Sequence, residues 1–205
     1  MQRIGILGGT FNPIHNAHLA LALQALNKFN LSKVIFIPNS HPPHKPVEGL
    51  IGATDRYNMV QLALTGHARL ILSRAELDRR GKSYAVDTVK ILEAEYPRAY
   101  FFYIMGVDAI NDILSWKKPL ELFEKCEFII ATRPGANTRQ FRRILRFPIL
   151  EKYQHKIHML EFKNETSSTE IRRRLKKGLP ISHMAPESVL KYIKLYKLYP
   201  PALSS

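Results

Sequence analysis

Six apolar segments rich in β-branched and aromatic residues alternate along the chain with longer stretches of helical periodicity. The segments expected as strands lie at about 2–8, 33–38, 69–74, 99–105, 127–132 and 156–162. The stretches expected as helices lie at about 17–30, 54–66, 83–96, 108–124 (with a break at Pro119), 137–154, 169–177 and 187–198. Strands and helices that alternate at this spacing form βαβ units with right-handed crossovers. The sequence therefore predicts an α/β fold: a Rossmann-like, doubly wound, mostly parallel six-stranded sheet with helices on both faces and C-terminal helices.

The length and composition are those of one globular domain over residues 1–205. No apolar run reaches the roughly 18 residues that a membrane helix needs, and the N-terminus enters a strand without a secretory leader. We therefore expect a cytoplasmic protein with no membrane partner. Cys126 is the sole cysteine, which excludes an intramolecular disulfide and a cluster of thiolate ligands. Its position at the start of a strand predicts a buried structural residue.

The net charge is strongly positive. The chain has 31 Lys and Arg against 17 Asp and Glu, a formal charge of +14 that attracts polyanions. Most of these side chains are expected on solvated helix faces, including the clusters Arg142–Arg143, Arg172–Arg174 and Lys176–Lys177. Charge alone leaves two classes of partner open, namely nucleic acid and nucleotide substrates.

The chain begins with a strand, a glycine pair and two histidines three residues apart. Ile4–Leu7 is the strand, Gly8–Gly9 ends it, and helical periodicity begins at Ala17. Backbone N–H groups at such a junction can bind phosphate, and the carboxyl ends of the strands are where ligands of this fold bind. His15 and His18 share a face if their turn is helical, so both can point at one ligand. This segment predicts chemistry on a phosphoryl group.

Other phosphate and metal motifs are missing from the sequence. There is no Gly-x-x-x-x-Gly-Lys-Ser/Thr loop and no His-Glu-x-x-His zinc motif, and Gly5, Gly8 and Gly9 do not fit Gly-x-Gly-x-x-Gly. His15 and His18 have no obvious third metal ligand at a useful spacing. We therefore predict no protein-bound metal.

A second candidate site lies at Ser167–Arg172. Ser167 and Glu170 form a capping box that opens the helix ended by Gly178. The start of a capped helix exposes N–H groups and the positive end of its dipole, and Arg172 adds a permanent cation. Such a helix start is suited to the terminal phosphates of a triphosphate.

Together the two segments resemble the nucleotidyltransferase superfamily with the motifs His-x-Gly-His and Ser-x-Thr-x-x-Arg. The downstream motif is intact as Ser167, Thr169 and Arg172. The upstream motif is His15-Asn16-Ala17-His18, in which Ala17 replaces the usual glycine, and its methyl group is expected to narrow the approach to the nucleotide slightly.

Within this superfamily, the sequence resembles one family in particular. Gly8–His15 looks like the Gly-Gly-Thr-Phe-Asp-Pro-Ile-His of bacterial nicotinate-nucleotide adenylyltransferases, with Asn12 where aspartate is common. The further segments that match this family are Pro43–Lys45, Glu76, Ser83–Thr88, Met105–Asp108, Leu114–Trp116, Arg133–Gly135, Tyr192–Ile193 and Leu198–Tyr199. The matches cover residues 4–199, nearly the whole chain.

The resemblance implies transfer of AMP from ATP to nicotinate mononucleotide, which gives deamido-NAD and pyrophosphate in NAD biosynthesis. The nucleophile is the phosphate of the mononucleotide, which is largely a dianion at neutral pH and needs no general base. Catalysis then depends on alignment and charge stabilisation. Mg²⁺ is expected on the phosphates of ATP rather than in a protein cage. A C-terminal helical part, about residues 165–205, is expected to complete the ATP site.

The resemblance also implies roles for individual residues. The residues implied in catalysis are His18, His15 and Arg172. Those implied in ATP binding are Gly8, Gly9, Thr10, Phe11, His15, His18, Gly106, Asp108, Arg133, Ser167, Thr169 and Arg172. Those implied in mononucleotide binding are Asn39, His44, Lys45, Ser83, Tyr84, Thr88 and Trp116. His18 would donate to the α-phosphate, and Trp116 would stack on the pyridine ring. Without the resemblance, Trp116 is interpreted as a core or surface aromatic residue.

Two alternatives stay open at this point. One is another adenylyltransferase of the superfamily, with nicotinamide mononucleotide or pantetheine phosphate as the acceptor; Ser83–Tyr84 and Trp116 argue against pantetheine phosphate. The other is a basic nucleic-acid-binding protein, although no nucleic-acid motif is visible in the sequence. The oligomeric state and the strength of the preference for nicotinate are not determined by the sequence.

Overall fold

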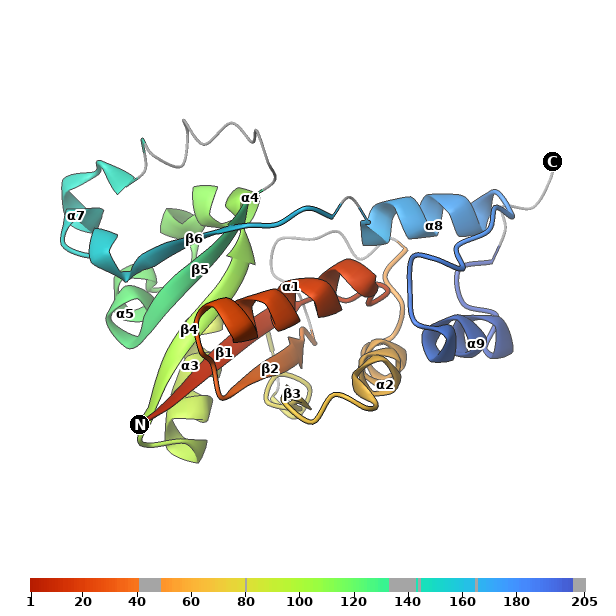
Figure 1. Ribbon diagram of the computed structural model, residues 1–205, viewed down its shortest axis with the longest axis horizontal. Coiled ribbons are helices and arrows are strands. Elements are labelled where there is room, and N and C mark those ends of the chain that lie inside the picture. The colour runs from red at the N-terminus through yellow and green to blue at the C-terminus, as the bar shows by residue number, and fades with distance from the viewer. Residues whose placement is uncertain (41–48, 80, 133–142, 144, 165, 201–205) are drawn as a thin grey trace.

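Six parallel strands form a twisted sheet in the order β3-β2-β1-β4-β5-β6 (Figure 1). The computed structural model describes residues 1–40, 49–79, 81–132, 143, 145–164 and 166–200. The strands are β1 (Gln2–Gly9), β2 (Lys33–Pro38), β3 (Leu70–Leu72), β4 (Ala99–Gly106), β5 (Cys126–Thr132) and β6 (Ile157–Glu161). This is the order of a doubly wound sheet, in which the direction of winding reverses between β1 and β4. The predicted fold class is confirmed.

Helices connect and flank the strands. They are α1 (Asn16–Lys28), α2 (Ala53–Leu64), α3 (Ala85–Glu95), α4 (Val107–Asn111), α5 (Pro119–Lys125), α7 (Pro148–Glu151), α8 (Ser168–Lys176) and α9 (Glu187–Leu195). Short 3₁₀ turns occupy Ile113–Ser115 and Gln154–Lys156. In the described part of the chain, no helix is both long and apolar enough to cross a membrane.

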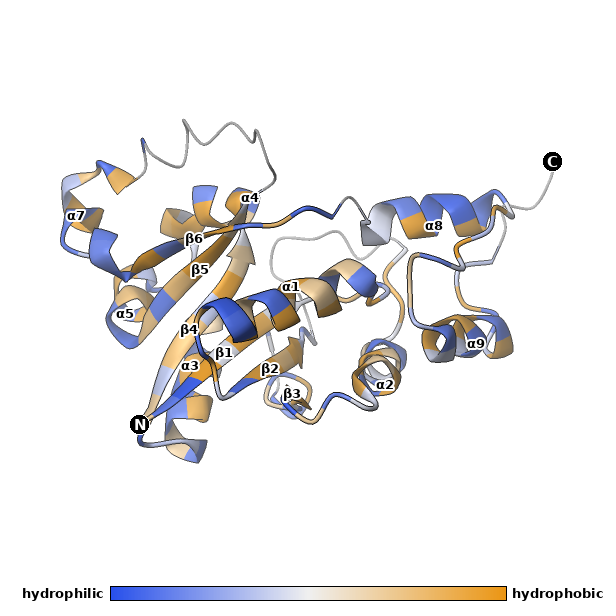
Figure 2. Cartoon of the chain, in the orientation of Figure 1, coloured by the Kyte–Doolittle hydropathy of each residue, from blue (hydrophilic) through white to orange (hydrophobic). Residues whose placement is uncertain are grey.

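Apolar side chains cover both faces of the sheet, because both faces are packed against helices. On β2, Val34 and Phe36 belong to one core cluster, whereas Ile35 and Ile37 belong to the other. Helices α1, α2 and α9 contribute to the first cluster, and α3, α4 and α5 contribute to the second. Figure 2 shows the resulting hydrophobic colouring of β4 and β5. Cys126 is buried at the start of β5, as predicted.

Two predicted helices differ from the structure. The stretch 108–124 divides earlier than expected, because α4 ends at Asn111 and α5 begins at Pro119. Part of the stretch 137–154 lies outside the described residues. In the part that is described, the expectation of one continuous helix is wrong: Phe147 is extended, with a ψ of 129°, before Pro148 opens the short α7. A residue that precedes proline is disfavoured in the helical conformation, which explains the interruption.

The C-terminal helices are attached to the start of α1 and to α2. The backbone N–H of Asn16 donates to the carbonyl of Met184 at 2.9 Å, and its side-chain amide donates to the carbonyl of His183 at 3.0 Å. On α9, the hydroxyl of Tyr192 donates to Asp55 of α2 at 2.9 Å. These bonds hold the C-terminal part of the chain beside the histidine motif.

Candidate active site

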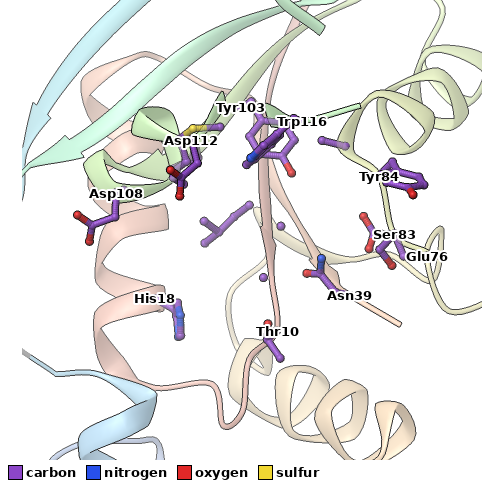
Figure 3. A pocket seen from close by; sticks show the side chains of 18 of the residues that line it. Thr10, His18, Asn39, Glu76, Ser83, Tyr84, Tyr103, Asp108, Asp112 and Trp116 are labelled. Atoms are coloured by element: carbon purple, nitrogen blue, oxygen red, sulfur yellow. The ribbon is translucent and has the colours of Figure 1, made fainter. Parts of the chain in front are cut away.

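A cavity of about 700 Å³ lies beyond the carboxyl ends of β1, β2 and β4. It is therefore at the reversal of strand order, where the sequence analysis placed the ligand. Figure 3 shows His18 and Asp108 on one side of it and Ser83, Tyr84 and Glu76 on the other. The residues that line it are Leu7, Gly8, Gly9, Thr10, His18, Leu21, Asn39, Glu76, Ser83, Tyr84, Ala85, Tyr103, Ile104, Met105, Gly106, Asp108, Ala109, Asp112, Ser115, Trp116 and Lys117.

The glycine pair brings bare backbone to the cavity wall. A Cβ atom at Gly8 would lie 2.8 Å from the hydroxyl oxygen of Tyr103, and one at Gly9 would lie 3.1 Å from the ring of Phe11. A side chain at Gly8 would therefore displace the Tyr103 hydroxyl, and one at Gly9 would have to shift the Phe11 ring by a few tenths of an ångström. The backbone of this turn is left accessible to a ligand, as a phosphate site needs.

The two histidines are stacked, but they do not contribute equally to the cavity. Their ring centroids lie 3.7 Å apart, and the backbone N–H of His15 donates to Nδ1 of His18 at 3.3 Å. Because Nδ1 of a neutral His18 is then the acceptor, its ring proton is on Nε2. Phe11 supports the His18 ring edge-on at a centroid distance of 5.0 Å. His18 lines the cavity as a hydrogen-bond donor, whereas His15 lies behind it.

Burial keeps His15 uncharged. The side chain is 4% exposed, and burial lowers its pKa to about 4, so the imidazole is neutral at pH 7. Its Nδ1 atom has no hydrogen-bond partner among the described residues. His15 was predicted to be a catalytic and ATP-binding residue. Its ring is stacked on that of His18 and is not among the residues that line the cavity.

The low pKa of His15 predicts a loss of stability in mild acid. An unfolded histidine titrates near pH 6.5, so between pH 6.5 and pH 4 the unfolded chain binds a proton that the folded chain does not. Stability therefore falls as the pH is lowered through this range. We expect the free energy of unfolding of wild type to drop by roughly 3 kcal/mol more than that of His15→Asn between pH 7 and pH 4, measured by urea denaturation. Parallel pH profiles of the two proteins would contradict this.

The start of α8 is bonded to the turn that precedes the histidines. Ser167 caps the helix by accepting from the N–H of Glu170 at 3.2 Å, which is one half of the predicted capping box; the Glu170 carboxylate instead accepts from Arg173 and Arg174. Arg172 donates to the carbonyl of Asn12 at 2.8 Å and to the hydroxyl of Thr169 at 3.3 Å. Segments about 160 residues apart in sequence are thus brought together. Ser167, Thr169 and Arg172 do not line the cavity itself but stand next to the histidine turn.

The two departures from the family motif have different consequences. The side chain of Asn12 donates to the carbonyl of Gly49 at 3.0 Å and accepts from the hydroxyl of Tyr199 at 2.7 Å. An ionised aspartate could accept from Tyr199 but could not donate to Gly49. Ala17 is a buried residue of α1 and does not line the cavity. Its methyl group therefore does not narrow the approach to the cavity, contrary to the prediction.

Aromatic and polar side chains form the opposite wall. Trp116 is half-buried and lines the cavity. Its ring meets the Tyr103 ring edge-on, with the two ring centroids 6.1 Å apart. The ammonium group of Lys117 lies 4.6 Å from the centre of the Tyr84 ring and 3.0 Å from the carboxylate of Asp87. This wall offers flat apolar surface beside the start of α3, whose first N–H groups can bind an anion.

Glu76 is a buried acid in this wall to which the sequence analysis gave no role. It is 3% exposed, and burial raises the pKa of its carboxyl group, an effect that the hydroxyls of Ser83 and Thr88 oppose. Thr88 was expected to contact the mononucleotide, but its hydroxyl donates to Glu76 at 2.7 Å and does not line the cavity. Phe11 likewise lies under His18 rather than at the surface. A family match had singled out Glu76, but only the fold reveals that it is buried.

The remaining predicted residues divide into two groups. Gly106 and Asp108 line the cavity where α4 begins, and no atom of the described residues beyond the chain neighbours of Gly106 lies within 4 Å of the Cβ position there. Asn39 lines it as well, with a buried Oδ1 that lacks a partner among the described residues. The predictions that fall outside the described residues concern His44, Lys45 and Arg133.

Metal ligands do not cluster in the described part of the chain, where no group of three or more His, Cys, Asp or Glu side chains is arranged to hold an ion. The acidic side chains at the cavity are Glu76, before α3, and Asp108 and Asp112, in the first turn and at the C-cap of α4. Arg172 stands beside the histidine turn, outside the cavity lining. The glycine turn and the ring of His18 offer donors for phosphate on one side of the cavity, and Trp116 offers a flat aromatic surface on the other.

Known proteins are similar to this chain in sequence and in fold. Residues 6–174 match the family model described as cytidylyltransferase-like. The probable nicotinate-nucleotide adenylyltransferase of Moorella thermoacetica is 43% identical over 203 residues, covering 98% of this chain and 93% of the relative. That of Desulfitobacterium hafniense is 40% identical over 199 residues, covering 97% and 96%. The fold is similar to that of Plasmodium falciparum nicotinic acid mononucleotide adenylyltransferase complexed with NaAD, with a TM-score of 0.79, 23% identity and full coverage of both chains.

Proposed function

Because the chain belongs to the cytidylyltransferase-like family and, within it, to the nicotinate-nucleotide adenylyltransferases, we propose that it transfers AMP from ATP to nicotinate mononucleotide. The products are deamido-NAD and pyrophosphate, and the enzyme is a nucleotidyltransferase of NAD biosynthesis. The observation that supports this best is the cavity at the β1/β4 reversal. It combines a glycine turn and an Nε2–H donor from His18 on one side with an aromatic wall on the other.

The chemistry needs alignment more than acid–base catalysis. An oxygen of the mononucleotide phosphate attacks the α-phosphorus of ATP, a new P–O bond forms, and the bond from this phosphorus to the bridging oxygen breaks, so pyrophosphate leaves with the electron pair. The nucleophile is already ionised. His18 therefore has no proton to remove. Its Nε2–H would donate to a non-bridging oxygen of the α-phosphate, on which charge accumulates in the transition state.

The substrates would occupy the two ends of the cavity. We assign the pyridine ring to Trp116 and the nicotinate carboxylate to the first N–H groups of α3, after Tyr84. The adenosine ribose would meet Asp108, and the leaving pyrophosphate would meet the start of α8 at Arg172, so the C-terminal helices complete the ATP site of a single domain. Mg²⁺ would enter as part of the substrate MgATP and neutralise phosphate charge.

An assay of pyrophosphate release tests the proposal. With MgATP, nicotinate mononucleotide should be used with a kcat/KM about 10- to 100-fold above that of nicotinamide mononucleotide, because the amide loses charge-assisted hydrogen bonds to backbone N–H groups. Equal values for the two acceptors would contradict the preference for the acid.

The same assay separates the alternatives. Pantetheine phosphate serves as a third acceptor, and release of pyrophosphate with it alone would identify a different adenylyltransferase. An oligonucleotide titration at several salt concentrations covers the nucleic-acid alternative, because binding to phosphates weakens steeply with salt. Salt-dependent binding without any release of pyrophosphate would replace the proposed function.

A further inference from the structure

Arg56 of α2 is the largest of the fully buried side chains, with 1% of its surface exposed. Its hydrogen bonds within the described part of the chain all go to backbone carbonyls. Its Nε donates to Ile51 at 3.0 Å, Nη1 to Thr10 at 2.8 Å and Nη2 to Ser40 at 3.3 Å. Among the described residues it forms no ion pair with a carboxylate. Burial lowers the pKa of this guanidinium group, so its charge is kept at an energetic cost that the three carbonyls offset only in part.

The three acceptors belong to three different segments. Thr10 follows β1, Ser40 follows β2, and Ile51 lies just before α2. Only arginine presents five N–H donors on a rigid planar group, which lets one side chain bond to several backbone segments at once. A methionine or leucine of similar volume would fill the same space without that cost. The arrangement therefore indicates a need to fix these segments relative to one another.

Two of these segments form the wall of the cavity. Thr10 and Asn39, the residue before Ser40, both line it, and Figure 3 shows them on neighbouring parts of the wall. The backbone N–H of Ser40 donates to the hydroxyl of Ser83 at 3.2 Å, and Ser83 lies in the opposite wall. Ser40 is thus held from both sides, and Arg56 is the buried link between the glycine turn and the wall assigned to the mononucleotide.

We propose that Arg56 is a positioning residue for the transfer reaction, which fixes the Thr10 turn and the Ser40 segment so that the mononucleotide phosphate and the α-phosphate of ATP meet in line. The inference rests on the proposed function. Arg56 itself does not line the cavity, so it acts through the backbone that it holds. In-line transfer depends steeply on this geometry, and a displacement of about 1 Å can lower the rate by about 100-fold.

The test compares Arg56→Met, Arg56→Lys and a control, Met59→Ala. Met59 is on the same helix, is fully buried and contributes to the core without reaching the cavity. We expect Arg56→Met to lower kcat by about 100-fold and Arg56→Lys by about tenfold, with both KM values within about threefold of wild type. Met59→Ala should lower the thermal midpoint but leave kcat within about twofold. All rates are taken well below each midpoint and per mole of folded protein.

Amide hydrogen exchange gives a readout that does not depend on activity. It should become faster at Asn39 and Ser40 in both Arg56 variants, because their N–H groups donate to the Gly9 carbonyl and to the Ser83 hydroxyl, and it should stay unchanged there in Met59→Ala. If Arg56→Met does not fold, Arg56→Lys decides by the same criteria. The inference is overturned if kcat stays within about threefold of wild type, if Met59→Ala loses as much kcat at a similar midpoint, or if exchange at the two amides does not change. An inactive wild type would contradict the proposed function instead, and exchange would still test the link.

Discussion

Replacement of His18 by alanine is expected to lower kcat by about 100- to 1,000-fold, with the KM for nicotinate mononucleotide within about threefold of wild type. His18 lines the cavity, and the bond from the backbone N–H of His15 leaves its ring proton on Nε2. The group that is lost is a donor aimed at charge that develops in the transition state, so the loss appears in kcat rather than in binding. Steady-state kinetics of pyrophosphate release measures both constants.

Two further variants sharpen this test. His18→Gln keeps an N–H donor on a side chain of similar reach, so part of the lost kcat should return. His155→Ala removes an exposed histidine from the turn before β6 and should leave kcat unchanged. If His18→Ala turns over at nearly the wild-type rate, then this histidine does not stabilise the transition state, and the role assigned to it in the mechanism is wrong.

Replacement of Arg172 by alanine is expected to lower kcat by about 100- to 1,000-fold as well. Two effects combine here. The variant loses a permanent cation at the start of α8, where the leaving pyrophosphate is assigned. It also loses the 2.8 Å bond to the carbonyl of Asn12, which attaches the helix to the histidine turn. The reverse reaction should show a raised KM for pyrophosphate, since the same group would bind it as a substrate.

The neighbouring arginine supplies the matched control. Arg173 is exposed and donates to Glu170 at 2.7 Å within the same helix. Arg173→Ala removes one positive charge from the same turn of α8 but no bond to the histidine turn, and kcat should stay within about threefold of wild type. Equal losses in the two variants would mean that the general basic field, rather than the position of Arg172, supports the reaction. Arg172→Lys should fall between them, because lysine keeps the charge but not the planar group.

Much of the fold could be predicted because local patterns determine it. The β-rich segment at 33–38 has the same bounds as β2, and Ser167 is the N-cap of α8 as expected. The failure at 137–154 is also local in origin, because the helical periodicity continues across Phe147–Pro148, where proline disfavours a helix. Identities at motif positions likewise located the cavity residues His18 and Trp116.

The sequence by itself determined the alternation of strands and helices, and it indicated the end of β1, with its glycine turn and His18, as the place where the cavity lies. Only the tertiary structure decided that His15 supports His18 from behind, that Arg172 bonds to Asn12, and that Arg56 links Thr10 to Ser40. The reason is physical. Propensity, capping and periodicity depend on neighbours within a few residues, whereas these contacts join segments that meet only after the two faces of the sheet have been packed.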